Sequence, residues 1–418
     1  MSNWPPLRSA LTLFCLGMVV LHLAVFWRVR EQAAQGSPDF SIFYTAGLML
    51  RRGQGQQLYD DVVQRQTQQE FRHSPGGPAE TLPYNHPPFE AAPYVGLSRF
   101  PYLRAYELWF VANLFFLAAF VWLARLSVPE LRSRFPELLF LAPLAFFPVA
   151  YALMQGQDSI LLMLLYCLAY TALRRGHDLS AGVYLGLGLF KFHLVLPFVF
   201  ILLLRRRWRA LSGVLLSAAL DFGVSLALVG WKELLYYPRY ALKVNQEQAA
   251  GVIVPENMPN LRGLFTGWTW SPAIEPWLNL ALLVISLGLV VWAAERWRAE
   301  EVIPLEDWNT GFSIAVLVTF LVGYHSYNQD MSILLLPGLI TLDRLLASPA
   351  GHRKWVAVFL GLMFFSPLTI VLTLRVSHQN VFALVLMGLV ASLALFSAAG
   401  HQGASVSTDI EPAGAQLR

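Results

Sequence analysis

Long apolar runs separated by short polar segments dominate the chain. A run of about 20 apolar residues is long enough to cross a bilayer as an α-helix. The pattern therefore predicts an all-α integral membrane protein. The apolar runs fall near residues 7–27, 103–124, 137–154, 158–173, 180–204, 210–230, 277–294, 308–323, 331–346, 355–373 and 380–399.

The run 180–204 carries arginines on both sides, at 174–175 before it and within 205–209 after it. Short arginine-rich loops stay in the cytoplasm, so both ends should lie on the same side of the membrane. We therefore predict a hairpin of two short helices with Lys191 at its apex. The alternative is a single span with a snorkelling lysine. Counting the hairpin as two gives about twelve spans, with both termini inside.

Two long polar segments, 28–102 and 231–276, fall on the outer side in this topology. Long loops cross the membrane largely regardless of their charge, so their own basic residues agree with this placement. We expect residues 1–399 to form one transmembrane domain, with the two outer loops as the roof of an active site. Residues 400–418 are rich in small polar residues and are predicted to be a disordered cytoplasmic tail.

The first outer loop begins with a predicted helix. Ser37 can cap it, Pro38 suits its first position, and Asp39 lies in its first turn. Apolar residues at helical spacing follow on one face, which predicts an amphipathic helix in the headgroup plane. Capping alone is the simpler interpretation of Asp39. The apolar face consists of Phe40, Phe43, Tyr44, Gly47 and Leu48.

Composition supports the membrane assignment, because 56% of the residues are hydrophobic and only 13% are charged. A soluble protein carries about 25% charged residues. The formal net charge of +4 is too small to indicate a nucleic-acid partner, and none is expected. Both cysteines, Cys15 and Cys167, lie in apolar runs and are expected to be buried free thiols.

Ionisable groups at the membrane edge are candidates for function, because placing one in a bilayer costs about 2.5–3.5 kcal/mol. Asp39 and Lys191 meet this criterion. An acid and a cation at one membrane face suit a lipid-phosphate substrate, since the cation can hold the phosphate and the carboxylate can accept a proton from an attacking hydroxyl.

Other carboxylates have simpler interpretations. Asp158 and Asp330 are predicted to cap the helices that follow them. For Asp60 two interpretations stay open, a direct role in the site and a structural role in a turn. Glu90 could line a cavity, and the role of Asp221 inside a span is open. The sequence has no phosphate-binding glycine loop, and its His and Cys residues lack zinc-ligand spacing, so no nucleotide cofactor and no zinc site are indicated.

Several motifs resemble glycosyltransferase family 87, the polyprenyl-phosphate-mannose-dependent mannosyltransferases of the GT-C class. They are Asp39-Phe40, Leu58-Tyr59-Asp60, "YNHPPF", "QGQDSILLMLL", the segment around Lys191, and Asn260-Leu261-Arg262-Gly263. They occur in the family's order, and the similarity covers most of residues 35–345. This resemblance implies a GT-C-like helical bundle.

The resemblance also implies a reaction and its residues. Mannose would move from a polyprenyl-phosphate donor to a glycolipid or glycan acceptor, with inversion and without a metal. The family's essential acid maps onto Asp39, the general base, and His325 would lie near the donor phosphate. Lys191 occupies the position of a lysine found in the family. The other substrate-binding candidates are Tyr44, Asp60, Gln155, Gln157, Asn260 and Arg262.

We expect a monomer in the cell membrane, in contact with lipids, with its active site facing the periplasm or cell exterior. A transporter or flippase for lipid-linked sugars is the main alternative, and it would need charged residues along a path through the spans. A sensor or scaffold subunit would tolerate substitution of Asp39. In a fourth hypothesis the protein has the same fold, and the sugar that it transfers is another pentose or hexose carried on the same lipid.

Overall fold

The computed structural model describes residues 5–72, 81–246, 254–266, 273–297, 305–347, 353–368, 370–371 and 380–408. Every regular element in these ranges is a helix. The chain is therefore an all-α protein, as predicted. The longer helices are α1 (Pro5–Ala34), α5 (Tyr102–Ala124), α7 (Leu138–Ala145), α8 (Phe147–Gln155), α9 (Ser159–Arg174), α10 (Asp178–Leu187), α11 (Phe192–Leu204), α12 (Trp208–Gln246), α14 (Glu275–Arg296), α15 (Leu305–Val322), α16 (Leu335–Ala347), α17 (Arg353–Phe364) and α19 (Phe382–Thr408).

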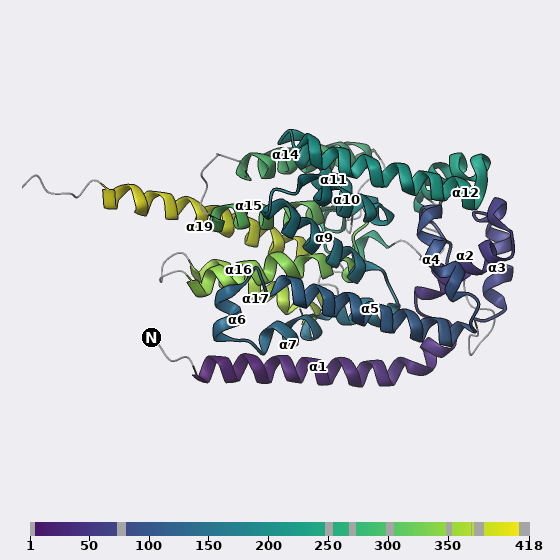
Figure 1. Ribbon diagram of the computed structural model, residues 1–418, viewed down its shortest axis with the longest axis horizontal. Helices are drawn as coiled ribbons and strands as arrows, with labels where there is room; N and C mark the ends of the chain where they lie inside the picture. Colours follow the sequence, from purple (N-terminus) through teal and green to yellow (C-terminus); the bar gives the residue numbers. More distant parts are fainter. Residues whose placement is uncertain are drawn as a thin grey trace, which may run out of the picture.

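Shorter helices complete the bundle, and most of them lie in the polar loops. In Figure 1 the long helices run roughly along the long axis, and α2, α3 and α4 gather at the end away from the N-terminus. These elements are α2 (Phe40–Arg51), α3 (Asp61–Gln69), α4 (Ala92–Leu97), α6 (Pro129–Arg134), α13 (Leu261–Thr266), and the 3-10 helices η1 (Gly55–Gln57), η2 (Pro88–Ala91), η3 (Leu189–Lys191), η5 (Pro255–Asn257) and η6 (Asn328–Leu334).

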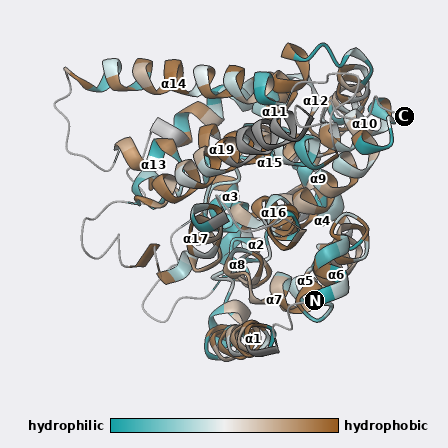
Figure 2. Ribbon diagram, turned by 90° about the vertical axis from the view of Figure 1, so that its left-hand side faces the viewer, coloured by the Kyte–Doolittle hydropathy of each residue, from teal (hydrophilic) through white to brown (hydrophobic). Residues whose placement is uncertain are grey.

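Five described helices are long and apolar enough to cross a membrane, or up to seven if the bent pairs α7–α8 and α10–α11 each count as one span. Figure 2 shows apolar residues on the peripheral helices α1 and α14. Several of their large side chains are exposed, among them Trp27 and Trp277. These findings support a membrane-spanning protein, and the count of about twelve spans stays a prediction.

The segment around Lys191 is the predicted hairpin. Its two ends meet, because Arg207 Nη1 lies 3.3 Å from Asp178 Oδ2. Helices α10 and α12 then run in the same direction with their backbones close together, since a Cβ at Gly182 would collide with the Ala210 carbonyl and one at Gly186 with Ser217. The turn η3 places Lys191 at the apex, where its side chain is buried.

This close approach yields a stability prediction. Gly182→Ala should lower the melting temperature of the purified protein, because the new methyl group overlaps the α12 backbone and overpacking typically costs about 1–3 kcal/mol. Gly223→Ala is the matched control, since Gly223 is exposed on α12 and its Cβ would meet nothing within 4 Å. Equal melting temperatures of the two variants would contradict the close α10–α12 packing.

The helix after Asp39 is present, but its surroundings differ from the expectation. Ten of the twelve residues of α2, from Phe40 to Met49, are buried. The helix packs against α3, α4 and α5 in place of exposing one face to headgroups. Gly47 permits the contact with α4, because a Cβ there would collide with the Tyr94 backbone. The sequence pattern could not distinguish lipid headgroups from protein as the partner of the second face.

Two hydrophobic clusters build the core. The larger one includes Ile160 and Phe190 and joins most of the long helices. The smaller one is rich in aromatic residues, such as Phe40 and Tyr94, and lies beneath the first-loop helices. Asp39 adjoins the smaller cluster and Lys191 adjoins the larger one, so the polar residues between them mark the junction of the two clusters.

The C-terminal helix is longer than expected. It continues through Thr408, so residues 400–408, which were predicted to be disordered, are helical. Residues 409–418 lie outside the described part of the chain. The single-domain boundary at residue 399 and the cytoplasmic location of the tail stay predictions.

Candidate active site

Asp39 stands at the N-cap position of α2, one residue before the helix begins. Its side chain makes no cap hydrogen bond. The carboxylate instead accepts a hydrogen bond from Gln157 Nε2, with 2.8 Å between Nε2 and Oδ2. The backbone N–H of Asp39 donates to Gln155 Oε1 at 3.1 Å. The capping interpretation is therefore wrong, and the carboxylate faces residues far away in the sequence.

The turn Gln155-Gly156-Gln157 holds Asp39 by both its backbone and its side chain. Gly156 makes this possible, because its φ of +63° is a left-handed conformation that favours glycine. A Cβ at Gly156 would also lie 2.7 Å from Phe40 Cβ. The α8–α9 connection thus presses against the start of α2 and presents two glutamine side chains to Asp39.

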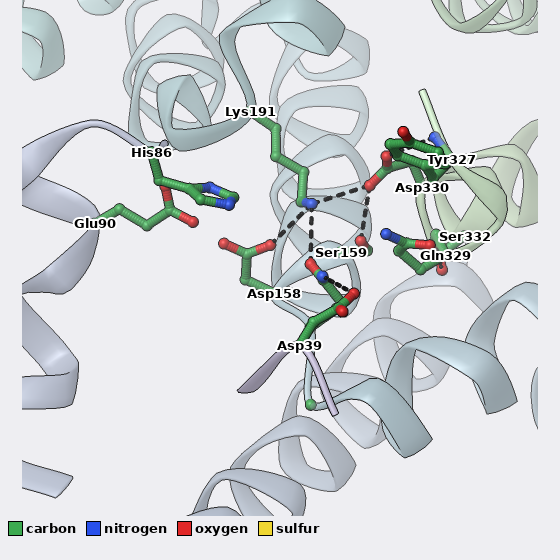
Figure 3. A network of polar contacts seen from close by, with 12 residues as sticks. Asp39, His86, Glu90, Asp158, Ser159, Lys191, Tyr327, Gln329, Asp330 and Ser332 are labelled. Carbon is green, nitrogen blue, oxygen red and sulfur yellow. Dashed lines mark hydrogen bonds and ion pairs between the residues drawn. The ribbon is translucent and has the colours of Figure 1, made fainter. Parts of the chain in front are cut away.

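Lys191 lies at the centre of a buried polar cluster (Figure 3). Its Nζ is 3.2 Å from Asp158 Oδ1 and 3.0 Å from Asp330 Oδ1. It is also 3.3 Å from Gln157 Oε1, so Gln157 bridges the lysine and Asp39. Figure 3 shows the carboxylates of Asp158 and Asp330 on either side of the amine, with Asp39 on a third side, below it in this view. The predicted hairpin apex and the predicted acid therefore meet through one amide.

Asp330 has further contacts that fix its orientation. Ser159 Oγ donates to its Oδ1 at 2.9 Å, and the backbone N–H of Tyr327 donates to its Oδ2 at 2.9 Å. Asp330 was predicted to cap a helix that follows it, but it lies inside η6 as the third residue, where its side chain bonds back to the N-cap residue Tyr327 and also pairs with Lys191. Asp158 occupies the N-cap position of α9 but makes no cap hydrogen bond. Its predicted capping role is wrong, because its carboxylate turns to Lys191.

His86 and Glu90 form a second pair beside Asp158. His86 Nδ1 lies 3.0 Å from Glu90 Oε2, and the Glu90 side chain is 3% exposed. Pro87 and Pro88 set the start of η2 and place the two residues one turn apart. Figure 3 shows Glu90 on the opposite side of Lys191 from Asp330. One buried cation thus faces an excess of carboxyl groups.

Burial shifts the pKa values of these groups in the direction that reduces their charge. It raises the pKa of Glu90 to about 8 and that of Asp158 to about 7, although Lys191 opposes both shifts. Burial also raises the pKa of Asp39, while the hydrogen bond from Gln157 and the charge of Lys191 lower it. His86 has its pKa lowered to about 4 by burial, so it is neutral at pH 7.

A neighbouring group contains His325, Asn260 and Arg262. The Arg262 guanidinium lies 4.0 Å from the ring centroid of Tyr324 and donates to the Tyr324 carbonyl at 3.1 Å. Asn260 accepts a hydrogen bond from the Gly263 N–H at 2.9 Å and also donates to the Gly323 carbonyl. These contacts join the segment 260–263 to residues 323–324.

His325 lies between this group and the lysine cluster. Its ring centroid is 5.0 Å from that of Tyr327 and 5.8 Å from that of His193. Burial lowers its pKa to about 4, while Asp330 opposes the shift. The side chain is thus a neutral hydrogen-bonding group at pH 7, joined to Asp330 through Tyr327.

Two predicted site residues lie away from the cluster. Tyr44 donates to the Phe100 carbonyl at 2.8 Å, and its ring contacts Phe71 and Tyr102. Asp60 is exposed and accepts hydrogen bonds from the N–H groups at 62 and 63, at 2.9 and 3.2 Å, so it caps α3. Both side chains stabilise the first-loop helices.

His86 is the residue that sequence reasoning missed. It lies within "YNHPPFE", and the spacing of four between His86 and Glu90 was the available signal. No pattern in the chain predicts that Asp158 and Lys191 will lie near them, because these residues belong to segments far apart in the sequence. Among the described residues, no group of three or more His, Cys, Asp or Glu is placed to hold a metal ion.

A family model described as glycosyltransferase family 87 matches residues 84–323, which is more than half of the chain. The chain belongs to glycosyltransferase family 87. No curated protein and no solved structure matches it. This family 87 glycosyltransferase therefore uses a sugar donor and an acceptor. The matched residues include Glu90, Asp158 and Lys191, whereas Asp39 and His325 lie outside them.

The raised pKa of Glu90 predicts how the stability of this family 87 protein depends on pH. In the folded state Glu90 keeps its proton up to about pH 8, whereas its ordinary pKa is 4.5. Between pH 4.5 and pH 8 the unfolded chain therefore binds fewer protons than the folded protein. Because of this group, the free energy of unfolding decreases as the pH rises toward 8. Glu90→Gln removes this titratable group. The melting temperature of the variant minus that of the native protein should therefore increase as the pH is raised from 5 to 8.5.

Glu107→Gln serves as the control, since Glu107 is exposed on α5 in a pair with Arg104. Its melting curve should follow that of the native protein at every pH. Parallel pH dependence of Glu90→Gln and the native protein would show that Glu90 is ionised in the folded state.

Proposed function

We propose that this protein is an inverting glycosyltransferase that moves a mannosyl or other hexosyl unit from a polyprenyl-phosphate donor to a glycolipid or glycan acceptor. Asp39 is the general base in this proposal. The observation that carries it is the position of the Asp39 carboxylate. The carboxylate makes no helix-capping hydrogen bond, the residue is partly exposed, and one oxygen accepts a hydrogen bond from Gln157.

The chemical step balances with one carboxylate. Asp39 accepts the proton of the acceptor hydroxyl, the hydroxyl oxygen bonds to the anomeric carbon, and the bond from that carbon to the phosphate oxygen breaks. The phosphate leaves with the bonding electron pair. A single displacement inverts the anomeric centre and needs no nucleophile on the enzyme, in contrast to a retaining double displacement.

His325 and Arg262 support a phosphate-binding role on the side of the second outer loop. Arg262 brings a guanidinium that can pair with phosphate oxygens, and neutral His325 can donate a hydrogen bond from its ring. Tyr324, on which Arg262 lies, is 55% exposed. The polyprenyl chain would supply affinity through the bilayer, at about 0.8 kcal/mol per buried CH₂.

We place the active site at the periplasmic or outer face. The arginines that flank the hairpin, at 174–175, 205–207 and 209, lie at the end of α10 and α11 opposite to Lys191. Arginine-rich short loops favour the cytoplasmic side, so the Lys191 end would face outward. Both substrates could then reach Asp39 from the outer leaflet and its surface.

The proposal is tested with the purified protein in proteoliposomes. Radiolabelled polyprenyl-phosphate mannose and polyprenyl-phosphate glucose would be supplied separately, with a panel of membrane glycolipids as acceptors. We expect transfer of label to one acceptor class and preference for mannose. Transfer of glucose alone would change the sugar but keep the mechanism. Movement of the donor between leaflets without any transfer would identify a flippase and overturn the proposal.

A further inference from the structure

The Lys191 ammonium is already surrounded by acceptors. Three oxygens, from Gln157, Asp158 and Asp330, lie 3.0–3.3 Å from its nitrogen. An ammonium group has three N–H bonds and no lone pair. The side chain is 5% exposed, so a phosphate could reach the nitrogen only by displacing one of these oxygens. This arrangement differs from the expected role of Lys191 as a phosphate ligand.

The lysine also decides which end of the Gln157 amide faces Asp39. Lys191 can only donate hydrogen bonds, so the amide oxygen must point toward it. The amide nitrogen then points to Asp39 Oδ2, as the 2.8 Å contact shows. If the amide turned over, its oxygen would face the carboxylate and its NH₂ group would face the ammonium, and both contacts would be repulsive.

We propose that Gln157 is a positioning residue for Asp39, and that Lys191 acts by fixing the direction of the Gln157 amide. The proposal rests on the proposed role of Asp39 as the general base. Gln157 occupies Oδ2, and Gln155 holds the backbone N–H of the same residue. Oδ1 is therefore the oxygen that accepts the proton of the acceptor hydroxyl.

The sign of the expected pH effect follows from the local charges. Burial raises the pKa of Asp39, and the Gln157 hydrogen bond and Lys191 lower it. Removing the amide therefore raises the pKa further. A general base works when deprotonated, so the acid limb of kcat/KM should move to higher pH. The titratable or charged groups that act on Asp39 or respond to it are Arg72, His86, Tyr102, Tyr151, Lys191, Tyr327 and Asp330.

The test compares Gln157→Met with Gln155→Met in transfer assays between pH 5 and pH 10. Gln157→Met should move the acid limb upward by about one pH unit or more, because it removes a hydrogen bond to a charged group. Gln155→Met is the matched control from the same turn, and it contacts the backbone of Asp39. It should lower kcat at every pH and leave the limb in place.

A second variant tests the role of Lys191. Lys191→Met combined with Asp330→Asn removes one charge of each sign, so the net charge of the cluster is unchanged. We expect the acid limb to move upward as in Gln157→Met, while the affinity for polyprenyl phosphate, measured by product inhibition, stays within about threefold. A tenfold or greater loss of affinity would show that Lys191 binds the phosphate after all.

Asp39→Asn is measured alongside to separate the two proposals. Retention of transfer by Asp39→Asn would remove the proposed general base, whatever the glutamine variants do. Loss of transfer in Asp39→Asn together with an unmoved acid limb in Gln157→Met would leave the base in place and reject the positioning role.

Discussion

Replacing Asp39 with asparagine should lower kcat for sugar transfer by about a thousandfold, within the range of about 10²–10⁴ for loss of a general base. The asparagine side chain has the shape of aspartate, and its oxygen can still accept the hydrogen bond from Gln157 Nε2. It cannot take a proton from the acceptor hydroxyl. The binding of the polyprenyl-phosphate donor should change by no more than a few-fold, because Asp39 acts on the acceptor.

Two measurements check this result. Initial rates at saturating donor and acceptor give kcat, and titration of the donor under conditions without an acceptor gives its affinity. Glu107→Gln is an acid-to-amide change at an exposed site on α5 and should transfer sugar at the native rate. If Asp39→Asn keeps kcat but loses donor affinity, the carboxylate binds the donor and another residue must be the base.

The sequence was sufficient to predict the class of fold and to bring Asp39 and Lys191 to one end of the bundle, where Gln157 bridges them; their roles in a site stay predictions. Hydropathy marked the helices, and the arginines on both sides of the run 180–204 predicted the hairpin that the Arg207–Asp178 ion pair confirms. That hairpin brings Lys191 to the face where Asp39 lies. The prediction worked because bilayer thickness and arginine placement are properties of short segments.

The partners of each charged group could not be predicted in the same way. Asp158 precedes a helix, and its local sequence gives capping as the default. In the structure the Asp158 carboxylate lies 3.2 Å from the ammonium of Lys191, 33 positions later, because a buried carboxylate gains more from a cation than from a cap. Asp60 has the same local pattern and does cap its helix. The difference is tertiary, because only Asp158 has a cation within reach.

The burial of α2 illustrates the same limit. Apolar positions on one face predicted an amphipathic helix, and this face is buried as expected. Small or polar residues on the other face, such as Ser41 and Thr45, are also buried. Thr45 satisfies its hydroxyl within the helix by donating to the Ser41 carbonyl. A polar face can thus pack against protein, and periodicity alone does not reveal it.

Lys191→Met should destabilise the fold by about 3–5 kcal/mol, because removing one partner of a buried ion pair leaves the other charge uncompensated. Here Asp158 and Asp330 would face each other with no cation between them. We expect a lower melting temperature and less monodisperse protein after purification. Lys354→Met is the control, since Lys354 is exposed on α17, and it should melt like the native protein.

The loss should depend on charge and on pH. Without Lys191, the carboxyl groups of Asp158 and Asp330 would bind protons more tightly in the folded state than in the unfolded chain. Stability of Lys191→Met should therefore recover as the pH falls from 8 to 5.

Adding Asp330→Asn should recover most of the melting temperature at pH 7, because Asp158, whose pKa is already raised to about 7, can take up a proton. The asparagine oxygen can accept from the Tyr327 N–H in the place of Oδ2, while its NH₂ group, in the place of Oδ1, can donate to the Ser159 hydroxyl. A double variant as unstable as Lys191→Met at every pH would indicate that the lysine stabilises the hairpin by packing, with no contribution from charge.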